Sequence, residues 1–338
     1  MEFLGEYGMF LAKVMTFVVA IVLVIGAVAS AGGKKAETKL SVRSMNERFK
    51  ALREQLEQAV LPKDVLKKQR KAAKAAEKKA AKAGETKKRV YVLRFKGDIR
   101  ASDVTHLREE ITALLNVATP EDEVVVCLES GGGMVHEYGL AASQLLRIRE
   151  RNIPLTVCVD KVAASGGYMM AVVANHIVVA PFAVIGSIGV IAQLPNFNRL
   201  LKKHDVDFEM HTAGEYKRTL TLFGENTDEA REKFRQDLAD VHGLFKSFVG
   251  QYRPQLQVEQ VANGDVWYGS KALEQGLVDQ LCTSDSYLQT RCETANVYEI
   301  SSKRPRSVKE RLGMAAEARI AGMFERVVEN LVWKKWFL

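Results

Sequence analysis

The stretch DKVAASGGYMMAVVANHIVVAP, residues 160–181, begins directly after the apolar run Leu155–Val159 and contains a single serine, Ser165. Only alanine and glycine lie within two positions of it on either side. An apolar run, a patch of small residues and a second apolar stretch predict a strand, a tight turn and a helix. The ordinary reading of the serine is a helix cap. The alternative is that Ser165 is a nucleophile, whose hydroxyl is left accessible because no bulky residues lie beside it in the sequence.

Strand-like and helical segments alternate on both sides of this stretch. Apolar runs at 90–95, 124–129, 155–159 and 176–180 alternate with amphipathic stretches at 104–115 and 135–149. This order predicts an α/β domain with a mostly parallel sheet, whose reactive loops gather at the carboxyl ends of the strands. Gly131, Gly132 and Gly133 follow one strand just as Ser165 follows the next, so backbone amides there would suit a developing oxyanion.

A serine nucleophile needs a base, and the six histidines show no spacing that ties one of them to Ser165. Lys217, in HTAGEYKRTL, is the alternative, and a lysine acts as a base only where burial lowers its pKa from about 10.4. Taken by itself, Lys217 reads as one surface lysine among many. His211, the histidine nearest to Lys217 in the sequence, stays a minor candidate.

The first ninety residues differ in character from the rest. Residues 14–31 carry no charge and predict a membrane anchor, with a cleaved signal peptide as the alternative. Residues 34–89 contain 19 Lys/Arg against 7 Asp/Glu, and the rest of the chain 30 against 34. The basic charge therefore belongs to a helical, partly Ala/Lys-rich linker, which is either solvated or lies against the membrane surface, and a nucleic-acid-binding core is not expected.

The predicted organisation has four parts. Residues 1–33 form the anchor, 34–89 the linker, 90–300 the α/β domain and 301–338 a basic amphipathic tail. The four cysteines have no metal-ligand spacing. Cys127 and Cys158 lie in apolar strands and are expected to be buried thiols, whereas Cys282 and Cys292 could pair.

Four motifs carry a resemblance to a known family. ESGGGMVHEYGLAASQLL, KVAASGGYMMAVVANHIVVAP, GSIGV and GEYKR occur in this order. Over residues 90–285 the chain resembles the signal peptide peptidase A family, which implies a crotonase/ClpP-like fold of stacked ββα units. It also implies a membrane-bound serine endopeptidase with a Ser/Lys dyad, no cofactor and no metal. The implied partners are peptide substrates, the bilayer and further copies of the chain in a ring-like assembly.

The resemblance also assigns residues. Ser165 matches the nucleophile and Lys217 the general base, which neighbouring subunits would contribute to one site. The amides of Gly132 and Gly166 match the oxyanion hole, with Gly133 supporting the turn. Ser187 and Gly189, in GSIGV, match the substrate groove. Where the family usually has Asn/Asp-Ser-Pro-Gly-Gly, this chain has ESGGG at 129–133, which removes the rigidity that proline gives.

Two other functional classes stay open at this point. The crotonase fold also serves acyl-CoA chemistry, and a catalytically silent membrane scaffold is a third reading. The expected location is the bacterial inner membrane, with a single span. The family places the catalytic domain in the periplasm, whereas Lys34, Lys35, Lys39 and Arg43 after the span favour the cytoplasm. The expected substrates are short apolar peptides such as signal-peptide remnants, or misfolded chains.

Overall fold

The computed structural model of the chain describes residues 8–21, 39–83, 88–214 and 216–303. The chain divides into two units, of which the larger comprises Leu40–Ser302 and the smaller joins Met1–Lys39 with Lys303–Leu338. In the smaller unit, residues 8–21 are helical. The predicted anchor at 14–31 extends beyond the described residues, and nearly all of the predicted tail lies outside them. Among the described residues, none of the helices is both long and apolar enough to cross a bilayer.

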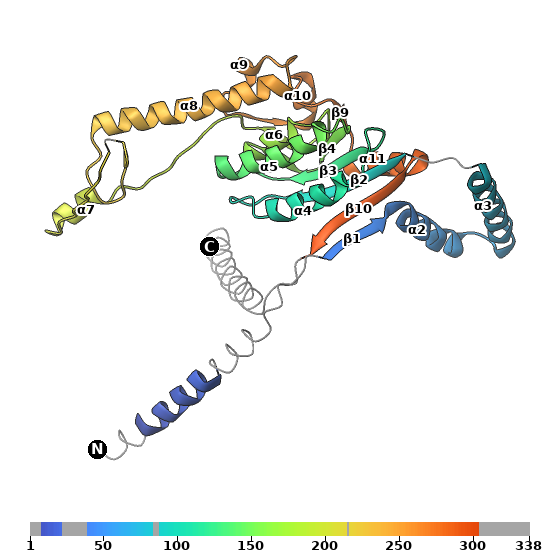
Figure 1. The fold of residues 1–338 in the computed structure, drawn as a ribbon, viewed down its shortest axis with the longest axis horizontal. Coiled ribbons are helices and arrows are strands. Elements are labelled where there is room, and N and C mark those ends of the chain that lie inside the picture. The colour runs from blue at the N-terminus through green and yellow to red at the C-terminus, as the bar shows by residue number, and fades with distance from the viewer. Residues whose placement is uncertain (1–7, 22–38, 84–87, 215, 304–338) are drawn as a thin grey trace, which may run out of the picture. The chain divides into compact units, whose positions relative to one another are not determined.

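The larger unit is built on a seven-stranded sheet in the order β1-β10-β2-β3-β4-β6-β9 (Figure 1). The strands are β1 (Lys39–Ser44), β2 (Arg89–Lys96), β3 (Glu123–Glu129), β4 (Leu155–Val159), β6 (His176–Val179), β9 (Gln280–Leu281) and β10 (Asn296–Lys303). From β10 to β9 all neighbouring pairs are parallel. The interior strand β4 is buried at all five positions, as expected of a parallel strand covered on both faces.

A second sheet of three strands lies at the carboxyl ends of this sheet. It contains β5 (Val162–Ala164), β7 (Val184–Gly186) and β8 (Val266–Tyr268) in the order β5-β7-β8. A strand of the large sheet is thus followed at once by a strand of the small sheet, as in β4-β5 and β6-β7. The α/β prediction is confirmed, and the two-sheet arrangement fits the ClpP-like fold that the resemblance implies.

Helices cover the two faces of the large sheet. One core contains side chains of α4 (Val104–Leu115), α5 (Val135–Arg149) and α6 (Gly166–Ala171) against alternate residues of β3 and β4. The other contains side chains of α2 (Met45–Val60) and α11 (Ser284–Thr294). All four cysteines belong to this second core and are free, Cys282 and Cys292 included.

Residues 40–60, expected in the linker, belong to this unit. Strand β1 extends the sheet beside β10, and Met45 at the start of α2 is buried. Asn46 fixes the contact, because its side-chain amide donates to the carbonyls of Cys292 and Ala295 at 2.9 Å each. Helix α3 (Lys63–Ala83) follows, with its described side chains exposed or half-buried.

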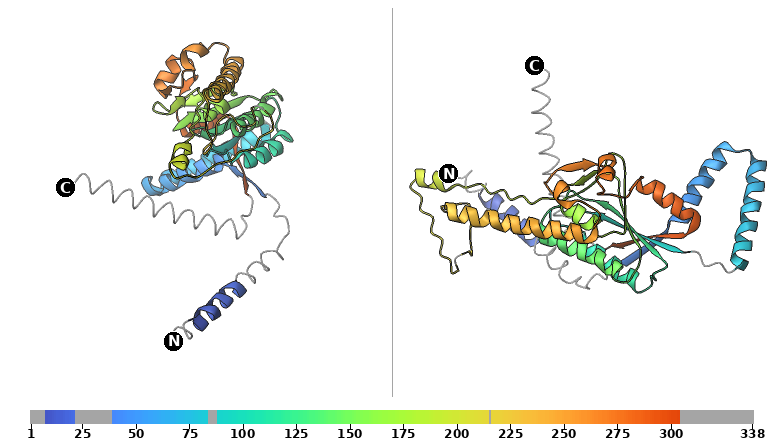
Figure 2. Two further views of the ribbon diagram at one scale, coloured as in Figure 1. Left: turned by 90° about the vertical axis from the view of Figure 1, so that its left-hand side faces the viewer. Right: turned by 90° about the horizontal axis from the view of Figure 1, so that it is seen from above.

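An arm, residues 190–227, leaves the small sheet after β7 and returns through the long helix α8 (Asp228–Tyr252). The arm and the first half of α8 extend past the sheets, with α7 (Asn198–Lys203) near the far end (Figures 1 and 2). In α8 the fully buried side chains are Phe245 and Val249, near its carboxyl end. Short helices α9 (Val258–Val261) and α10 (Gly269–Glu274) complete the unit.

Candidate active site

Ser165 lies at the sharp turn from β5 into α6. Its backbone has φ 53° and ψ −120°, a conformation that L-residues rarely adopt. The Ser165 amide donates to the Gly186 carbonyl at 2.8 Å, which ties the turn to β7. Its hydroxyl makes no hydrogen bond with any residue that the structure describes. A strained serine between a strand and a helix, with a free and half-buried hydroxyl, has the geometry of a nucleophile turn.

The glycine loop after β3 lies directly against this serine. The Ser130 amide donates to the Val162 carbonyl at 2.8 Å, and the Ala164 amide donates to the Ser130 carbonyl at 3.0 Å. Gly132 has φ 87°, and a Cβ there would come within 2.7 Å of the Ser165 Cβ and of the Gly166 amide nitrogen. The structure therefore brings together the two loops that the sequence singled out.

The amides of these loops have different partners. Gly132, expected in the oxyanion hole, donates its amide to the Ser130 hydroxyl at 3.1 Å. Among the described residues, the amides of Gly133 and Gly166 have no acceptor. Gly166 is also the first residue of α6, where backbone amides are left without helical partners. The amides of Gly131 and Gly167 also have no acceptor among these residues, so several backbone donors of the two loops are available to an oxyanion.

Lys217 lies apart from Ser165 along the fold, on the arm. It is exposed, and no hydrogen bond or ion pair joins it to Ser165 within the described part of this single chain. It lines a cavity of about 690 Å³, together with the apolar side chains of Phe208, Met210 and Phe223. His211 lines the same cavity and lies 3.4 Å from Glu209. One chain therefore holds the serine and glycine half of the predicted site without the lysine half.

Ser187 and Gly189 lie where β7 ends, beside the turn that holds Ser165. Ser187 has φ 51°, and its amide donates to the Asp265 carbonyl at 2.6 Å. A Cβ on Gly189 would meet Gly264 at 3.1 Å. The segment is thus held against the loop before β8, and the exposed side chain of Ile191 follows it. This placement fits a peptide-binding groove next to Ser165.

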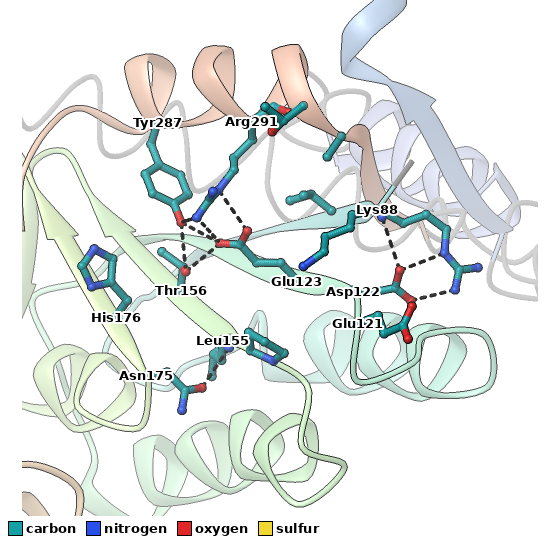
Figure 3. Close-up of a pocket in the computed structure, with 15 residues that line it drawn as sticks. Lys88, Glu121, Asp122, Glu123, Leu155, Thr156, Asn175, His176, Tyr287 and Arg291 are labelled. Carbon is teal, nitrogen blue, oxygen red and sulfur yellow. Dashed lines mark hydrogen bonds and ion pairs between the residues drawn. The ribbon is translucent and has the colours of Figure 1, made fainter. Parts of the chain in front are cut away.

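A separate pocket of about 370 Å³ lies at the opposite edge of the large sheet, at the amino ends of its strands (Figure 3). Glu123 accepts hydrogen bonds from Tyr287 at 2.6 Å and from Thr156 at 2.8 Å, and forms an ion pair with Arg291 at 3.0 Å. These hydrogen bonds and the ion pair attach α11 to the sheet. Their arrangement is that of a structural contact.

Comparison with known proteins identifies the family of the chain. Residues 2–145 match the family described as "Peptidase family S49 N-terminal", and residues 147–298 match "Peptidase family S49". The chain belongs to peptidase family S49. It is 46% identical to the "Probable protease SohB" of Haemophilus influenzae over 345 residues, covering 96% of each chain. It is 49% identical to the protein of the same name from Buchnera aphidicola, covering 86% of this chain and all of that one.

The resemblance to the signal peptide peptidase A family, and within it to SohB, is confirmed by these matches. A solved structure, that of the 1510-N membrane-bound stomatin-specific protease in complex with a substrate peptide, aligns with a TM-score of 0.42 and 15% identity. That alignment covers 68% of this chain and 97% of the other. Membership of family S49 makes the chain a peptidase.

Sequence reasoning did not find Ser130 and Tyr138. Ser130 is buried, and its hydroxyl lies 2.6 Å from that of Tyr138, which is fully buried on α5. Nothing in the spacing of these two residues marks them, because the contact depends on how α5 packs over the turn. The one local signal was the serine that begins the triple-glycine loop.

Proposed function

We propose that this S49 peptidase is a membrane-anchored serine endopeptidase in which Ser165 is the nucleophile and Lys217 the general base. The observation that supports it best is the strained turn at Ser165, together with the amides of Gly133 and Gly166, which have no acceptor in the described part of the chain. Strain of about 1–3 kcal/mol persists in proteins mainly where function needs it. A helix cap, the ordinary reading, does not account for this turn, because the Ser165 side chain caps nothing.

In the proposed reaction, neutral Lys217 takes the proton of the Ser165 hydroxyl as its oxygen attacks the peptide carbonyl carbon. The amides of Gly133 and Gly166 stabilise the negative oxygen, each donor contributing about 3–4 kcal/mol. The protonated lysine then gives its proton to the leaving amine, and an acyl-enzyme is left. A water molecule, activated by the same lysine, hydrolyses that ester and restores the serine.

The lysine is proposed to come from a neighbouring subunit of a ring-like assembly. Two features support this. Lys217 lies on an arm that extends past the sheets, and that arm exposes many apolar side chains. They are Ile191, Leu194, Phe197, Leu200, Val206, Phe208, Met210, Leu222 and Phe223. An apolar surface of this kind favours contact with another copy of the chain.

The test uses two inactive variants together. Ser165→Ala and Lys217→Ala are each expected to abolish labelling by a fluorophosphonate and hydrolysis of an apolar fluorogenic peptide. When the two variants are co-expressed, contacts between unlike subunits restore sites that contain both groups, so labelling returns on the Lys217→Ala chain. Lys203→Ala, another lysine of the arm, is the matched control and keeps full activity. A co-assembled mixture without labelling would refute the shared site.

The substrates proposed are short apolar peptides such as signal-peptide remnants, or misfolded chains. Two exposed apolar side chains support this, because Phe182 and Ile191 flank β7, the strand that holds the Ser165 turn. Peptide series that differ only in apolar content around the cleaved bond test this, with higher kcat/KM expected for the apolar members. Equal rates across the series would contradict the proposed preference.

Attachment to the bacterial inner membrane through residues 14–31 is part of the proposal. The charge-free run supports it. Alkaline phosphatase and green fluorescent protein fused after Leu338 report the side of the catalytic domain, because the first is active in the periplasm and the second fluoresces in the cytoplasm. Release of the chain from membranes by carbonate washing would exclude a retained span.

A further inference from the structure

The buried hydroxyls of Ser130 and Tyr138 form a chain of hydrogen bonds under the glycine loop. Tyr138 lies 2.7 Å from the carbonyl oxygen of Asp98 and 2.6 Å from the Ser130 hydroxyl, and Ser130 lies 3.1 Å from the Gly132 amide. Both side chains are 2% exposed or less. Buried polar groups at these distances are fully hydrogen-bonded, as stable interiors require.

The direction of each bond follows from counting protons. The Asp98 carbonyl can only accept, so the one proton of Tyr138 is donated there. Toward Ser130 the tyrosine must then accept, which means that the serine proton points at Tyr138. The Ser130 oxygen still has a free lone pair, and this lone pair accepts the hydrogen bond from the Gly132 amide. The order is therefore Gly132 to Ser130 to Tyr138 to Asp98, with no alternative pattern.

Tyr138 contacts the second half of the site through its ring. A Cβ on Gly166 would overlap the Tyr138 ring, so the ring packs flush against the residue that supplies another free amide. A Cβ on Gly97 would overlap both hydroxyl oxygens, which shows how closely the chain surrounds this pair. Burial raises the pKa of Tyr138, so its hydroxyl stays protonated and keeps donating at neutral pH.

We propose that Tyr138 and Ser130 are positioning residues for the oxyanion hole: their hydrogen bonds hold the Gly132 amide inward and so fix the shape of the glycine loop beside Ser165. Residue 131 is a glycine and not a proline, so no pyrrolidine ring restricts the turn there. Three successive glycines otherwise give the loop a large conformational freedom. The hydrogen-bond chain supplies the constraint. This inference rests on the proposed function, because it assumes that Ser165 is the nucleophile.

Tyr138→Phe tests the inference, since it removes the hydroxyl and keeps the ring against Gly166. The matched control is Tyr168→Phe, because Tyr168 is also fully buried and donates its hydroxyl to a backbone carbonyl, that of Leu277, at 2.8 Å. Tyr138→Phe loses two buried hydrogen bonds and Tyr168→Phe loses one, so Tyr138→Phe is expected to melt at the lower temperature while both variants fold. For the full chain acting on a fluorogenic peptide, Tyr138→Phe is expected to lower kcat about 10- to 100-fold, less than the loss of a whole oxyanion donor. KM is expected to change little in either variant, and kcat to change little in Tyr168→Phe.

Ser130→Ala provides a second, independent test, because it removes the acceptor of the Gly132 amide and leaves Tyr138 in place. It is expected to reduce kcat and the rate of fluorophosphonate labelling by the same order as Tyr138→Phe. Equal kcat in Tyr138→Phe and Tyr168→Phe, with an active wild type, would overturn the positioning role. A wild type that is labelled no faster than Ser165→Ala would instead overturn the proposed function.

Discussion

Replacing Ser165 by glycine is expected to stabilise the fold while it removes the nucleophile. At φ 53° and ψ −120° a residue with a Cβ stores about 1–3 kcal/mol of backbone strain, and glycine stores almost none. Glycine also costs about 0.5–1 kcal/mol, because the unfolded chain gains conformational freedom. The serine hydroxyl makes no hydrogen bond that would be lost among the described residues. The balance is a gain of about 1 kcal/mol, or about 2–4 °C in Tm for a domain of this size.

Ser165→Ala is the matched comparison, because it lacks the hydroxyl and keeps the strain. Thermal unfolding of the detergent-solubilised full chains, followed by scanning calorimetry, measures the difference between the two variants. Ser165→Gly should melt above both Ser165→Ala and the wild type, and neither variant should react with fluorophosphonate. If Ser165→Gly melts at or below Ser165→Ala, the turn is not strained, and the main support for a nucleophile there is lost.

Three further predictions concern residues around this framework. Gly132→Ala should abolish labelling because its Cβ would lie 2.7 Å from the nucleophile loop, whereas Gly131→Ala, with open space around it, should retain labelling. Arg253→Met leaves the carboxylate of Asp279 without its bidentate partner at 2.8 and 2.9 Å, which should cost about 3–5 kcal/mol in urea unfolding; a loss under about 1 kcal/mol would contradict this. Burial raises the pKa of Glu110 to about 7, so its contribution to stability is present below pH 4.5 and is lost as pH rises through 7. Glu110→Gln should therefore gain stability over the wild type between pH 5 and 8, by up to about 3 kcal/mol, and a gap that does not change with pH would refute the assignment.

The sheet and the reactive turn were predictable because their signals are local. Leu155–Val159 is apolar throughout because both faces of this strand are covered. The residues after it are small because larger side chains would not fit in the turn. The triple glycine was recognisable for the same reason. The triple glycine lies next to Ser165 because the carboxyl ends of parallel strands meet at one edge of the sheet.

Contacts between distant segments were not predictable in this way. Strand β1 pairs with β10, more than 250 residues later in the chain, and its short charged sequence has no pattern that distinguishes it from a linker. The role of the Gly132 amide was also hidden, because its acceptor depends on the hydroxyl of a buried helix residue, Tyr138. A spacing pattern shows which residue types recur along the chain. It does not show which backbone amides are already hydrogen-bonded in the folded protein.

The division of the chain into a body that carries Ser165 and an arm that carries Lys217 has a consequence for control. With a base supplied by a neighbour, as proposed above, the specific activity of the preparation would rise with its concentration and vanish on dilution. Newly synthesised copies would be inactive until enough of them had assembled, which would protect other proteins from unwanted cleavage.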